Sequence, residues 1–223
     1  MTIENYQFKW ADKIGLGGFG TVYKGKHIHR GNIVALKECA IESDSQGFQA
    51  MKEVKNFQKL GKHQNIVHLF DFYFRNNAFW FVMEFCDLGH LSQYMRKHNP
   101  GFEKKLDIMY QCASAVAFMH TLQTPIIHRD IKPANILLKR ENDKEVVKIT
   151  DFGLSKILDP DPVKKHLHMT HAGTPIFMAP EIFMRQEYDE KVDVFSLGLV
   201  YMCMVNFLPG DKELFPALRK YFH

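Results

Sequence analysis

The chain has 223 residues, 46% of them hydrophobic and 24% charged, which is typical of a globular protein with one large domain or two small lobes. Its 29 basic and 25 acidic residues leave a net charge of +4, too small and too scattered to indicate nucleic acid or an anionic membrane as a partner. The four cysteines lie far apart without CxxC spacing, so neither a disulfide framework nor a zinc site is predicted.

No targeting or membrane segment is indicated. The first ten residues, MTIENYQFKW, contain no basic segment followed by an apolar run, so we predict no secretory signal and place the protein in the cytoplasm or the nucleus. The most apolar stretch, residues 192–208, is interrupted by polar residues such as Asp193 and is shorter than a bilayer requires. We expect a buried core helix there and no membrane span.

A glycine-rich turn, IGLGGFGTVYKG, joins the first two predicted strands. Gly15, Gly17, Gly20 and Val22 form the pattern GxGxxGxV, and glycine allows a backbone to approach phosphates closely. The competing interpretation, a dinucleotide-binding fingerprint, requires a helix to begin after the glycines. Residues 21–23 favour a strand instead, so the sequence predicts a hairpin.

The next apolar strand, residues 33–37, ends with Lys37 in the motif VALK. Alone, such a lysine is no more than an edge residue whose stem covers apolar surface. Residues 45–60 then predict a helix, with Glu53 one position from its apolar stripe. This stripe comprises Phe48, Met51, Val54, Phe57 and Leu60.

Two further strands, residues 66–74 and 78–84, precede the irregular stretch FCDLGHL. A short helix is predicted over residues 91–97 and a long core helix over residues 103–122. We expect His120 on the long helix to be a packed or capping residue rather than a ligand. The core face predicted for this helix comprises Leu106, Met109, Tyr110, Ala113, Val116, Ala117 and His120.

Residues 126–153 place four polar side chains in a strand, loop and strand frame. Asp130, Lys132 and Asn135 follow a short apolar strand, and Asp151 follows the strand that returns from a polar turn. Phosphoryl transfer requires a carboxylate to accept a proton, oxygen ligands for magnesium and a cation near the transferred phosphate. These four side chains supply all three requirements.

The motifs HRDIKPAN and DFG, together with the glycine turn, VALK and MAPE (residues 178–181), resemble those of the eukaryotic protein kinases. The resemblance extends over residues 8–208 in the family's order. It implies an α+β, two-lobed fold with a small antiparallel-sheet lobe over residues 1–84. The hinge and a mostly helical lobe would occupy residues 85–223. Because few residues remain after the apolar helix, we expect this lobe to lack its last helices, to expose apolar surface and to be marginally stable.

The resemblance also assigns roles. Asp130 would be the catalytic base, Lys132 would contact the γ-phosphate, and Asn135 and Asp151 would bind Mg²⁺. Lys37, paired with Glu53, would contact the α- and β-phosphates of ATP. Asp193 would hold the backbone of the HRD motif. The positions implied for ATP binding are Gly15, Leu16, Gly17, Gly18, Phe19, Gly20, Val22, Ala35, Lys37, Met83, Glu84, Cys86 and Leu137.

The predicted function is transfer of the γ-phosphate of ATP to a serine or threonine hydroxyl of a protein substrate. Lys132 in DIKPAN and Thr174 before APE favour serine/threonine over tyrosine specificity. A small-molecule kinase is an alternative only if MAPE and Asp193 match by chance. A nucleotide-binding pseudokinase or a weakly active scaffold is the other alternative, disfavoured because the full catalytic set is present. GGFG, MEFCDxG and VDVFSLGL resemble the kinases of translation-initiation factor 2 α-subunit.

The sequence also predicts a regulatory site and a feature of substrate specificity. Thr170 lies where an activating phosphate would fall in this family, and Arg129 and Lys156 could bind that phosphate. His90 and Ala134 occupy positions that are acidic in kinases favouring arginine before the phosphorylation site. We therefore predict no strong preference for arginine there.

Overall fold

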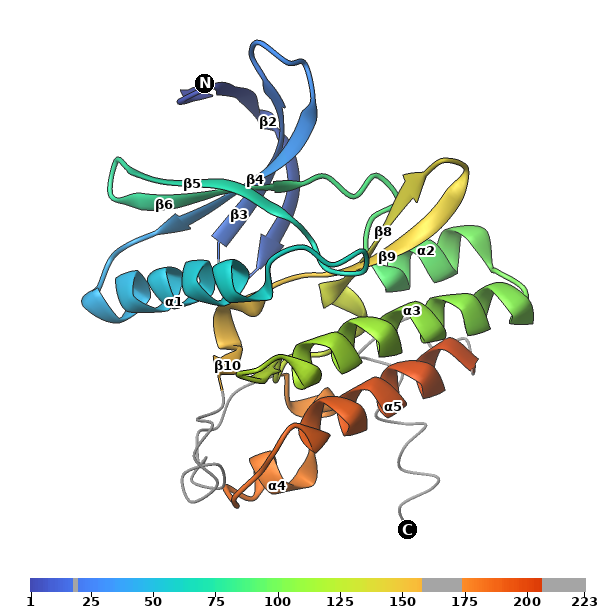
Figure 1. Cartoon of the computed structure of the whole chain (residues 1–223). Helices are drawn as coiled ribbons and strands as arrows, with labels where there is room; N and C mark the ends of the chain where they lie inside the picture. Colours follow the sequence, from blue (N-terminus) through green and yellow to red (C-terminus); the bar gives the residue numbers. More distant parts are fainter. Residues whose placement is uncertain (18–19, 158–173, 206–223) are drawn as a thin grey trace. The chain divides into compact units, whose positions relative to one another are not determined.

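A computed structural model describes residues 1–17, 20–157 and 174–205 of the chain (Figure 1). The chain divides into two compact units. The first contains residues 1–62 and 67–86, and the second contains residues 63–66 and the described residues from Asp87 onward. The short segment 63–66 therefore belongs to the second unit although both of its flanks belong to the first.

The first unit is a six-stranded antiparallel sheet with one helix, α1 (Asp44–Leu60) (Figure 1). Its strand order is β1-β2-β3-β4-β6-β5. The fold of this unit agrees with the expectation from the sequence, including the glycine-rich hairpin between the second and third strands. The strands are β1 (Thr2–Ile3), β2 (Tyr6–Gly17), β3 (Gly20–His27), β4 (Ile33–Ala40), β5 (Leu69–Arg75) and β6 (Ala78–Glu84).

One face of this sheet is sealed by aromatic side chains. The Phe8 ring lies 5.0 Å from that of Tyr23 and 5.3 Å from that of Trp80, measured between ring centroids. Leu36 completes this buried cluster. Because side chains alternate between the faces of a strand, Lys37 is directed to the opposite face. One face of the sheet therefore packs into an apolar core, and the opposite face carries the polar side chain of Lys37.

The apolar stripe predicted for helix α1 was wrong in part, because Val54, Phe57 and Leu60 are buried but the two earlier residues are not. Phe48 is 75% exposed and Met51 is 39% exposed, whereas Glu53 is buried. At 100° per residue, Phe48 and Met51 lie roughly 140° and 160° around the helix from Glu53, so burying Glu53 turns both outward. The buried residues are Ala50, Glu53, Val54, Asn56, Phe57 and Leu60.

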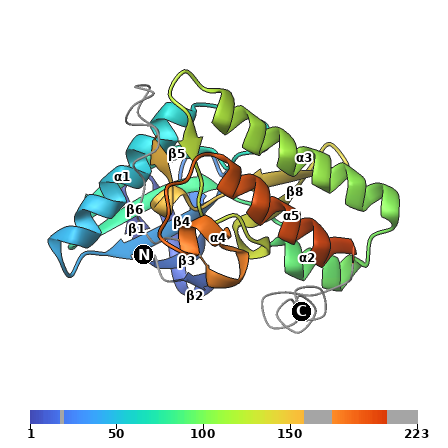
Figure 2. The same ribbon diagram turned by 90° about the horizontal axis from the view of Figure 1, so that it is seen from below.

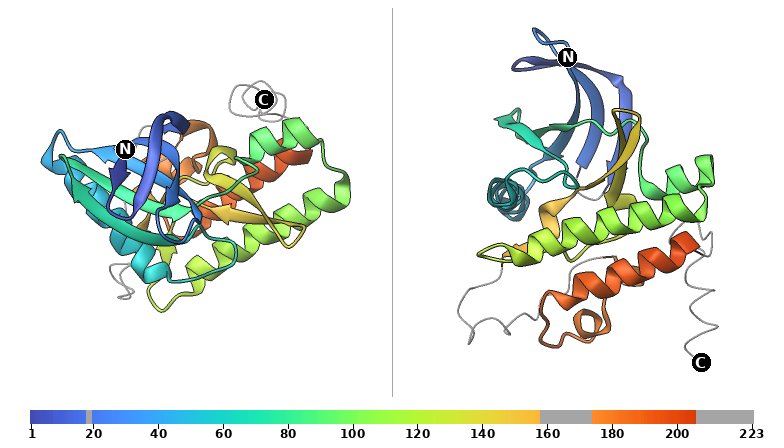
Figure 3. Two further views of the ribbon diagram at one scale, coloured as in Figure 1. Left: turned by 90° about the horizontal axis from the view of Figure 1, so that it is seen from above. Right: turned by 45° about the vertical axis from the view of Figure 1, so that its right-hand side comes forward.

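The second unit is mostly helical. Its two longest helices, α3 (Phe102–Thr121) and α5 (Lys191–Val205), lie side by side (Figures 2 and 3). The Tyr201 hydroxyl on α5 donates to the Met109 carbonyl on α3 at 2.5 Å. The other helices are α2 (Leu91–His98) and the short α4 (Pro180–Phe183), with single 3₁₀ turns at Pro133–Asn135, Phe152–Leu154 and Pro175–Phe177.

Two small sheets position the loops of this unit. β7 (Ile126–Ile127) pairs with β10 (Lys156–Ile157), and β8 (Ile136–Glu141) pairs with β9 (Lys144–Ile149). The turn between β8 and β9 is shorter than the predicted polar turn. Only Asn142 and Asp143 connect the strands, with φ of 49° and 61°. Asparagine and aspartate tolerate this left-handed conformation, which allows the tight hairpin.

The predicted core face of α3 was wrong in part. Leu106 is 46% exposed and Tyr110 is 76% exposed, while the buried stripe runs one position away. Both stripes are apolar, so helical spacing alone did not distinguish them. The buried residues are Lys105, Ile108, Cys112, Ala115, Val116 and Met119.

Helix α5 is apolar on nearly every side, and its apolar surface is only partly covered. Asp193 is fully buried, whereas Val194, Phe195 and Val205 are 54%, 37% and 52% exposed. Within the described part of the chain, no helix is long and apolar enough to cross a membrane.

Candidate active site

The glycine-rich turn is a hairpin, as predicted, and one of its glycines is sterically required. Gly15 pairs with Val22, and Val22 pairs in turn with Lys37 on β4. Gly20 has φ of 129°, and a Cβ placed there would lie 2.0 Å from the Glu38 carbonyl oxygen. No larger residue fits this backbone without a shift. The helix that a dinucleotide fingerprint requires is replaced by β3. Gly18 and Phe19 lie outside the described residues.

Lys37 and Glu53 form a buried ion pair on the face of the sheet opposite the aromatic cluster. The Lys37 ammonium lies 2.8 Å and 3.1 Å from the two carboxylate oxygens of Glu53. Their side chains are only 8% and 3% exposed. The ammonium also lies 5.6 Å from the centroid of the Phe81 ring. Two charges removed from water in this way must compensate one another, so each partner fixes the position of the other.

Other positions predicted to contact the nucleotide also belong to the first unit. Ala35 is two residues before Lys37, shares its face, and pairs with Met83 on β6. Ala35, Met83, Glu84 and Cys86 are buried, whereas Leu16 is 73% exposed. The Glu84 backbone N–H donates to the His68 carbonyl at 2.9 Å.

In the second unit, Asp130, Lys132 and Thr174 form a closed triangle of contacts. Lys132 Nζ lies 2.9 Å from Asp130 Oδ2 and donates to Thr174 Oγ1 at 2.6 Å. The Thr174 hydroxyl donates to Asp130 Oδ1 at 2.7 Å. Asp130 itself is buried. The sequence had pointed to Thr174 only as a sign of substrate class, whereas the structure places it directly on the predicted base.

Asn135 and Asp151 are brought together by the small sheet of β8 and β9. Asn135 immediately precedes β8, and its carbonyl accepts the Thr150 backbone N–H at 3.0 Å. Asp151 directly follows Thr150, so this hydrogen bond brings the backbone at Asp151 close to Asn135. The Asn135 amide nitrogen donates to the Asp130 carbonyl and to Asp130 Oδ2, both at 2.9 Å. This orientation commits the amide nitrogen to Asp130 and leaves the Oδ1 atom as the metal-binding end of the side chain.

The oxygen-rich donor set fits Mg²⁺. Asn135 and Asp151 would hold the ion, which in proteins is bound by one or two carboxylates and completes its shell with water and phosphate oxygens. Among the residues that the structure describes, no cluster of three or more His, Cys, Asp or Glu side chains could hold a metal.

The backbone before Asp130 is held in an uncommon conformation. Arg129 has φ of 66°, which a side chain with a Cβ adopts at a cost. Asp193, fully buried at the start of α5, accepts the backbone N–H groups of His128 and Arg129, each at 2.8 Å. The role expected for Asp193 is confirmed. His120 Nε2 lies 2.9 Å from the same carboxylate, so His120 is a partner of Asp193 and not only a packed residue.

The His128 and Phe152 side chains connect the two loops that carry Asp130 and Asp151. His128 Nε2 lies 3.0 Å from the Thr150 carbonyl, and its ring centroid lies 5.0 Å from that of Phe152. Phe152 is fully buried. Asp151, between Thr150 and Phe152, has φ of 70°. Burial of the next side chain and the contact to the preceding carbonyl fix the backbone on both sides of Asp151.

Comparison with known proteins identifies the family to which the chain belongs. The family model described as "Protein kinase domain" matches residues 8–215. The chain belongs to the protein kinase family. It is 35% identical over 231 residues to the human serine/threonine-protein kinase ULK1. The matched region covers 99% of this chain and 21% of ULK1.

Other relatives of this kinase domain carry the same description. Serine/threonine-protein kinase cst-1 of Caenorhabditis briggsae is 33% identical over 211 residues, covering 94% of this chain and 40% of its own length. Serine/threonine-protein kinase ATG1b of Arabidopsis thaliana is 35% identical over 197 residues, covering 87% of this chain and 27% of its own length. The chain thus spans less than half the length of these relatives, each of which is described as a serine/threonine-protein kinase. The likeness to the initiation-factor kinases stays a prediction.

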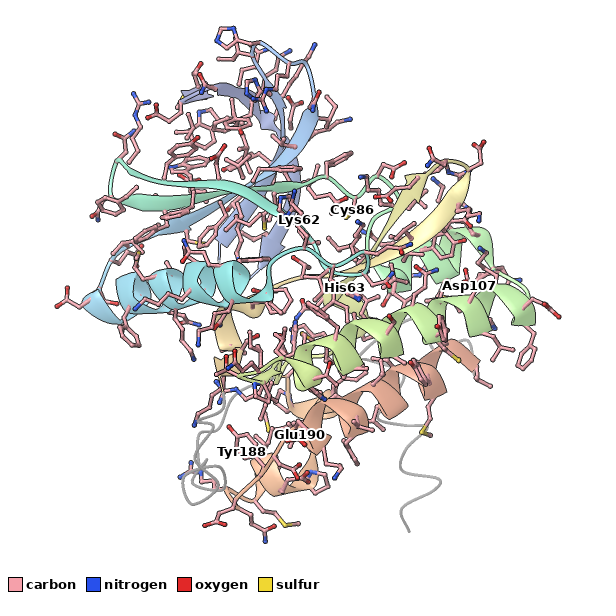
Figure 4. All side chains as sticks on the ribbon, in the orientation of Figure 1. Lys62, His63, Cys86, Asp107, Tyr188 and Glu190 are labelled. Carbon is pink, nitrogen blue, oxygen red and sulfur yellow. The ribbon has the colours of Figure 1, made fainter. Side chains whose placement is uncertain are left out.

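The side chain of Arg129 in this kinase domain is already engaged. Its guanidinium donates to the Leu154 carbonyl, from Nε at 2.8 Å and also from Nη2, and its Nη1 donates to the Tyr188 hydroxyl at 2.8 Å. Tyr188 precedes α5 and is labelled in Figure 4. Burial and the nearby Arg129 charge lower the pKa of Lys156. Thr170, the predicted phosphorylation site, lies outside the described residues.

Proposed function

We propose that this kinase domain transfers the γ-phosphate of ATP to a serine or threonine hydroxyl of a protein, with Asp130 as the base. The observation that carries the proposal is the triangle of Asp130, Lys132 and Thr174, in which a buried carboxylate and a cation meet at 2.9 Å. The Asn135 amide supplies one more donor to the same carboxylate. A carboxylate held by several hydrogen-bond donors keeps one orientation toward the substrate hydroxyl, as general base catalysis requires.

In the proposed reaction, the acceptor oxygen forms a bond to the γ-phosphorus while the bond from this phosphorus to the β,γ-bridging oxygen breaks. ADP leaves, and the proton of the acceptor hydroxyl passes to a carboxylate oxygen of Asp130. Lys132, within contact distance of Asp130, would neutralise charge on the transferred phosphoryl group. Positioning and charge neutralisation account for most of catalysis in this reaction class.

The first unit would bind the rest of the nucleotide. Lys37, held by Glu53, would contact the α- and β-phosphates, and the backbone of the glycine-rich hairpin would cover the phosphates. Asn135 and Asp151 would bind Mg²⁺, which neutralises phosphate charge when it is present. The backbone at Glu84 and Cys86 would hydrogen-bond the adenine, with Met83 limiting the space behind it.

A direct assay tests this function. The 223-residue protein is incubated with Mg²⁺, γ-labelled ATP and a generic protein substrate, and the labelled amino acids are identified after hydrolysis. We expect phosphoserine and phosphothreonine. Nucleotide binding without any transfer, to substrate or to the chain itself, would instead support a nucleotide-binding scaffold. Label on tyrosine alone would contradict the assigned class.

A further inference from the structure

The strand β9 has an unusual partner along one of its two edges. One edge pairs with β8 throughout its length. On the other edge, the carbonyl groups of Glu145 and Val147 and the N–H groups of Val147 and Ile149 face no extended strand of the described chain beyond the single bridge between Ile66 and Ile149. An unpaired strand edge is costly inside a protein, so these four groups need other partners.

A glutamine and an asparagine satisfy all four groups. Gln111 Oε1 accepts the Val147 N–H at 2.9 Å, and Gln111 Nε2 donates to the Glu145 carbonyl at 3.1 Å. Asn65 Nδ2 donates to the Val147 carbonyl at 3.1 Å, and the Asn65 carbonyl accepts the Ile149 N–H at 2.9 Å. Each residue thus bonds a carbonyl and the N–H two positions later, as one residue of a parallel strand does.

Gln111 is the centre of this arrangement because its carboxamide uses its full hydrogen-bonding capacity. Besides the two contacts to β9, its oxygen accepts from Asn65 Nδ2 at 3.0 Å, and its nitrogen donates to Asp107 Oδ2 at 3.2 Å. Asp107 lies one turn earlier on α3 and is labelled in Figure 4. A glutamine has two donor hydrogens and two acceptor lone pairs, and all four are occupied here. One side chain of α3 therefore fixes both the register of β9 and the chain at Asn65.

The position of β9 decides where Asp151 lies. Asp151 follows the end of β9 with only Thr150 between them, and the Thr150 N–H donates to Asn135. We infer that Gln111 is a positioning residue for the Mg²⁺ ligand Asp151, acting through the backbone of β9 without touching the metal. This inference rests on the proposed function, since it presumes that Asp151 binds Mg²⁺. Residues that orient metal ligands typically change metal affinity by about 10- to 100-fold when they are replaced.

The test compares Gln111→Met with the wild-type chain. Methionine keeps the length of the side chain and removes every polar contact to β9. We measure the Mg²⁺ concentration that half-saturates binding of a fluorescent ATP analogue, and the affinity for adenosine, which needs no metal. We expect the half-saturating Mg²⁺ concentration to rise by about 10-fold while the adenosine affinity stays unchanged. Amide hydrogen exchange at Val147 should become faster, because its acceptor is gone.

Matched variants separate the possible causes. Asp107→Ala removes the exposed contacts of Asp107 to Gln111 and to Lys104 but keeps both contacts of Gln111 to β9, so it should leave Mg²⁺ dependence unchanged. Gln111→Glu keeps the oxygen that faces Val147 but loses the donor to Glu145, so a smaller rise is expected. If Gln111→Met does not fold, Gln111→Glu decides, and a wild-type Mg²⁺ dependence in it overturns the inference.

The inference and the proposed function fail in different ways. Asp151→Asn is the reference variant, since it changes the presumed ligand itself. If Asp151→Asn and Gln111→Met both bind the nucleotide with wild-type Mg²⁺ dependence, the role of Asp151 is wrong. If Asp151→Asn weakens Mg²⁺-dependent binding and folded Gln111→Met does not, Gln111 only stabilises the fold and the positioning role is overturned.

Discussion

Asp193 accepts the backbone N–H of Arg129 at 2.8 Å, and Arg129 is the residue whose φ of 66° turns the chain toward the proposed base. The second oxygen of the same carboxylate accepts the N–H of His128 at 2.8 Å. A strained backbone persists only where its surroundings fix it from several sides. The buried Asp193 carboxylate therefore holds in place the loop that delivers Asp130.

Asp193→Asn should weaken this support. An amide offers one oxygen where the carboxylate offers two, so one of the two backbone N–H groups would face an NH₂ group. A buried donor without an acceptor costs about 1–3 kcal/mol, and we expect the free energy of unfolding in urea to fall by this amount. Phosphoryl transfer should also slow. Val194→Ala, on the exposed side of α5, serves as the control and should change neither quantity strongly.

Asp130→Asn tests the proposed base. The substitution keeps the shape of the side chain but removes the group that accepts the proton of the hydroxyl. We expect turnover to fall by about 10²- to 10⁴-fold while the affinity for nucleotide is retained, because general base catalysis contributes a factor of this size. Steady-state kinetics and equilibrium nucleotide binding provide the two measurements.

A control for Asp130→Asn is available in the β8–β9 turn. Asp143→Asn removes an exposed carboxylate from a residue with φ of 61°, a conformation that asparagine tolerates. It should retain full turnover. Equal turnover of Asp130→Asn and the wild-type chain would show that another group accepts the proton.

Glu53→Ala should be strongly destabilising because it removes the carboxylate that lies 2.8 Å from the buried Lys37 ammonium. The pair is 8% and 3% exposed, and breaking a buried pair by removing one partner costs about 3–5 kcal/mol. The double variant Lys37→Met/Glu53→Leu should lose less than Glu53→Ala, since no uncompensated charge remains. Urea unfolding of the wild type and both variants measures these differences. A larger loss in the double variant would show that packing, not charge, dominates the site.

Much of the fold follows from local patterns in the sequence. Apolar side chains alternate or cluster within residues 33–37 and 78–84, as is typical of strands. These residues do form strands, since they lie within β4 and β6. The helix over residues 91–97 was placed within one residue of α2. The motif spacing also identified Asp130, Asn135 and Asp151, because their positions relative to the flanking strands are local. The proposed roles of these residues stay predictions.

Other features depend on contacts between distant parts of the chain. Helix α3 carries two neighbouring apolar stripes, and only packing against other elements decides that Ile108 is buried while Tyr110 is exposed. His120 and Asp193 are 73 residues apart in sequence, and Gln111 and Asn65 are 46 apart. Such side-chain pairs leave no periodic signal. For Asp193 the family motif provided the missing information, whereas nothing in the sequence marked Gln111.

The ion pair between Lys104 and Glu145 should make stability depend on pH in the acidic range. Lys104 Nζ lies 3.0 Å from Glu145 Oε2, and Arg140 Nη2 lies 3.5 Å from Glu145 Oε1. The hydrogen bond from Lys104 is the largest factor that lowers the pKa of Glu145, and the charges of Lys104 and Arg140 lower it further. Asp107 lies 3.3 Å from Lys104 and competes for the same cation.

The sign of the effect follows from the lowered pKa. A carboxylate whose pKa is lower in the folded state stabilises that state at every pH above its unfolded pKa, where it is ionised in both states. This stabilisation is lost as the pH falls from the unfolded pKa through the folded pKa. Glu145→Gln should therefore lower the free energy of unfolding at pH 7 and lower it much less near pH 3, as measured by urea unfolding at several pH values. Glu103→Gln, on the exposed side of α3, is the control. If Glu145→Gln changes stability equally at both pH values, ionisation of Glu145 contributes nothing to the fold.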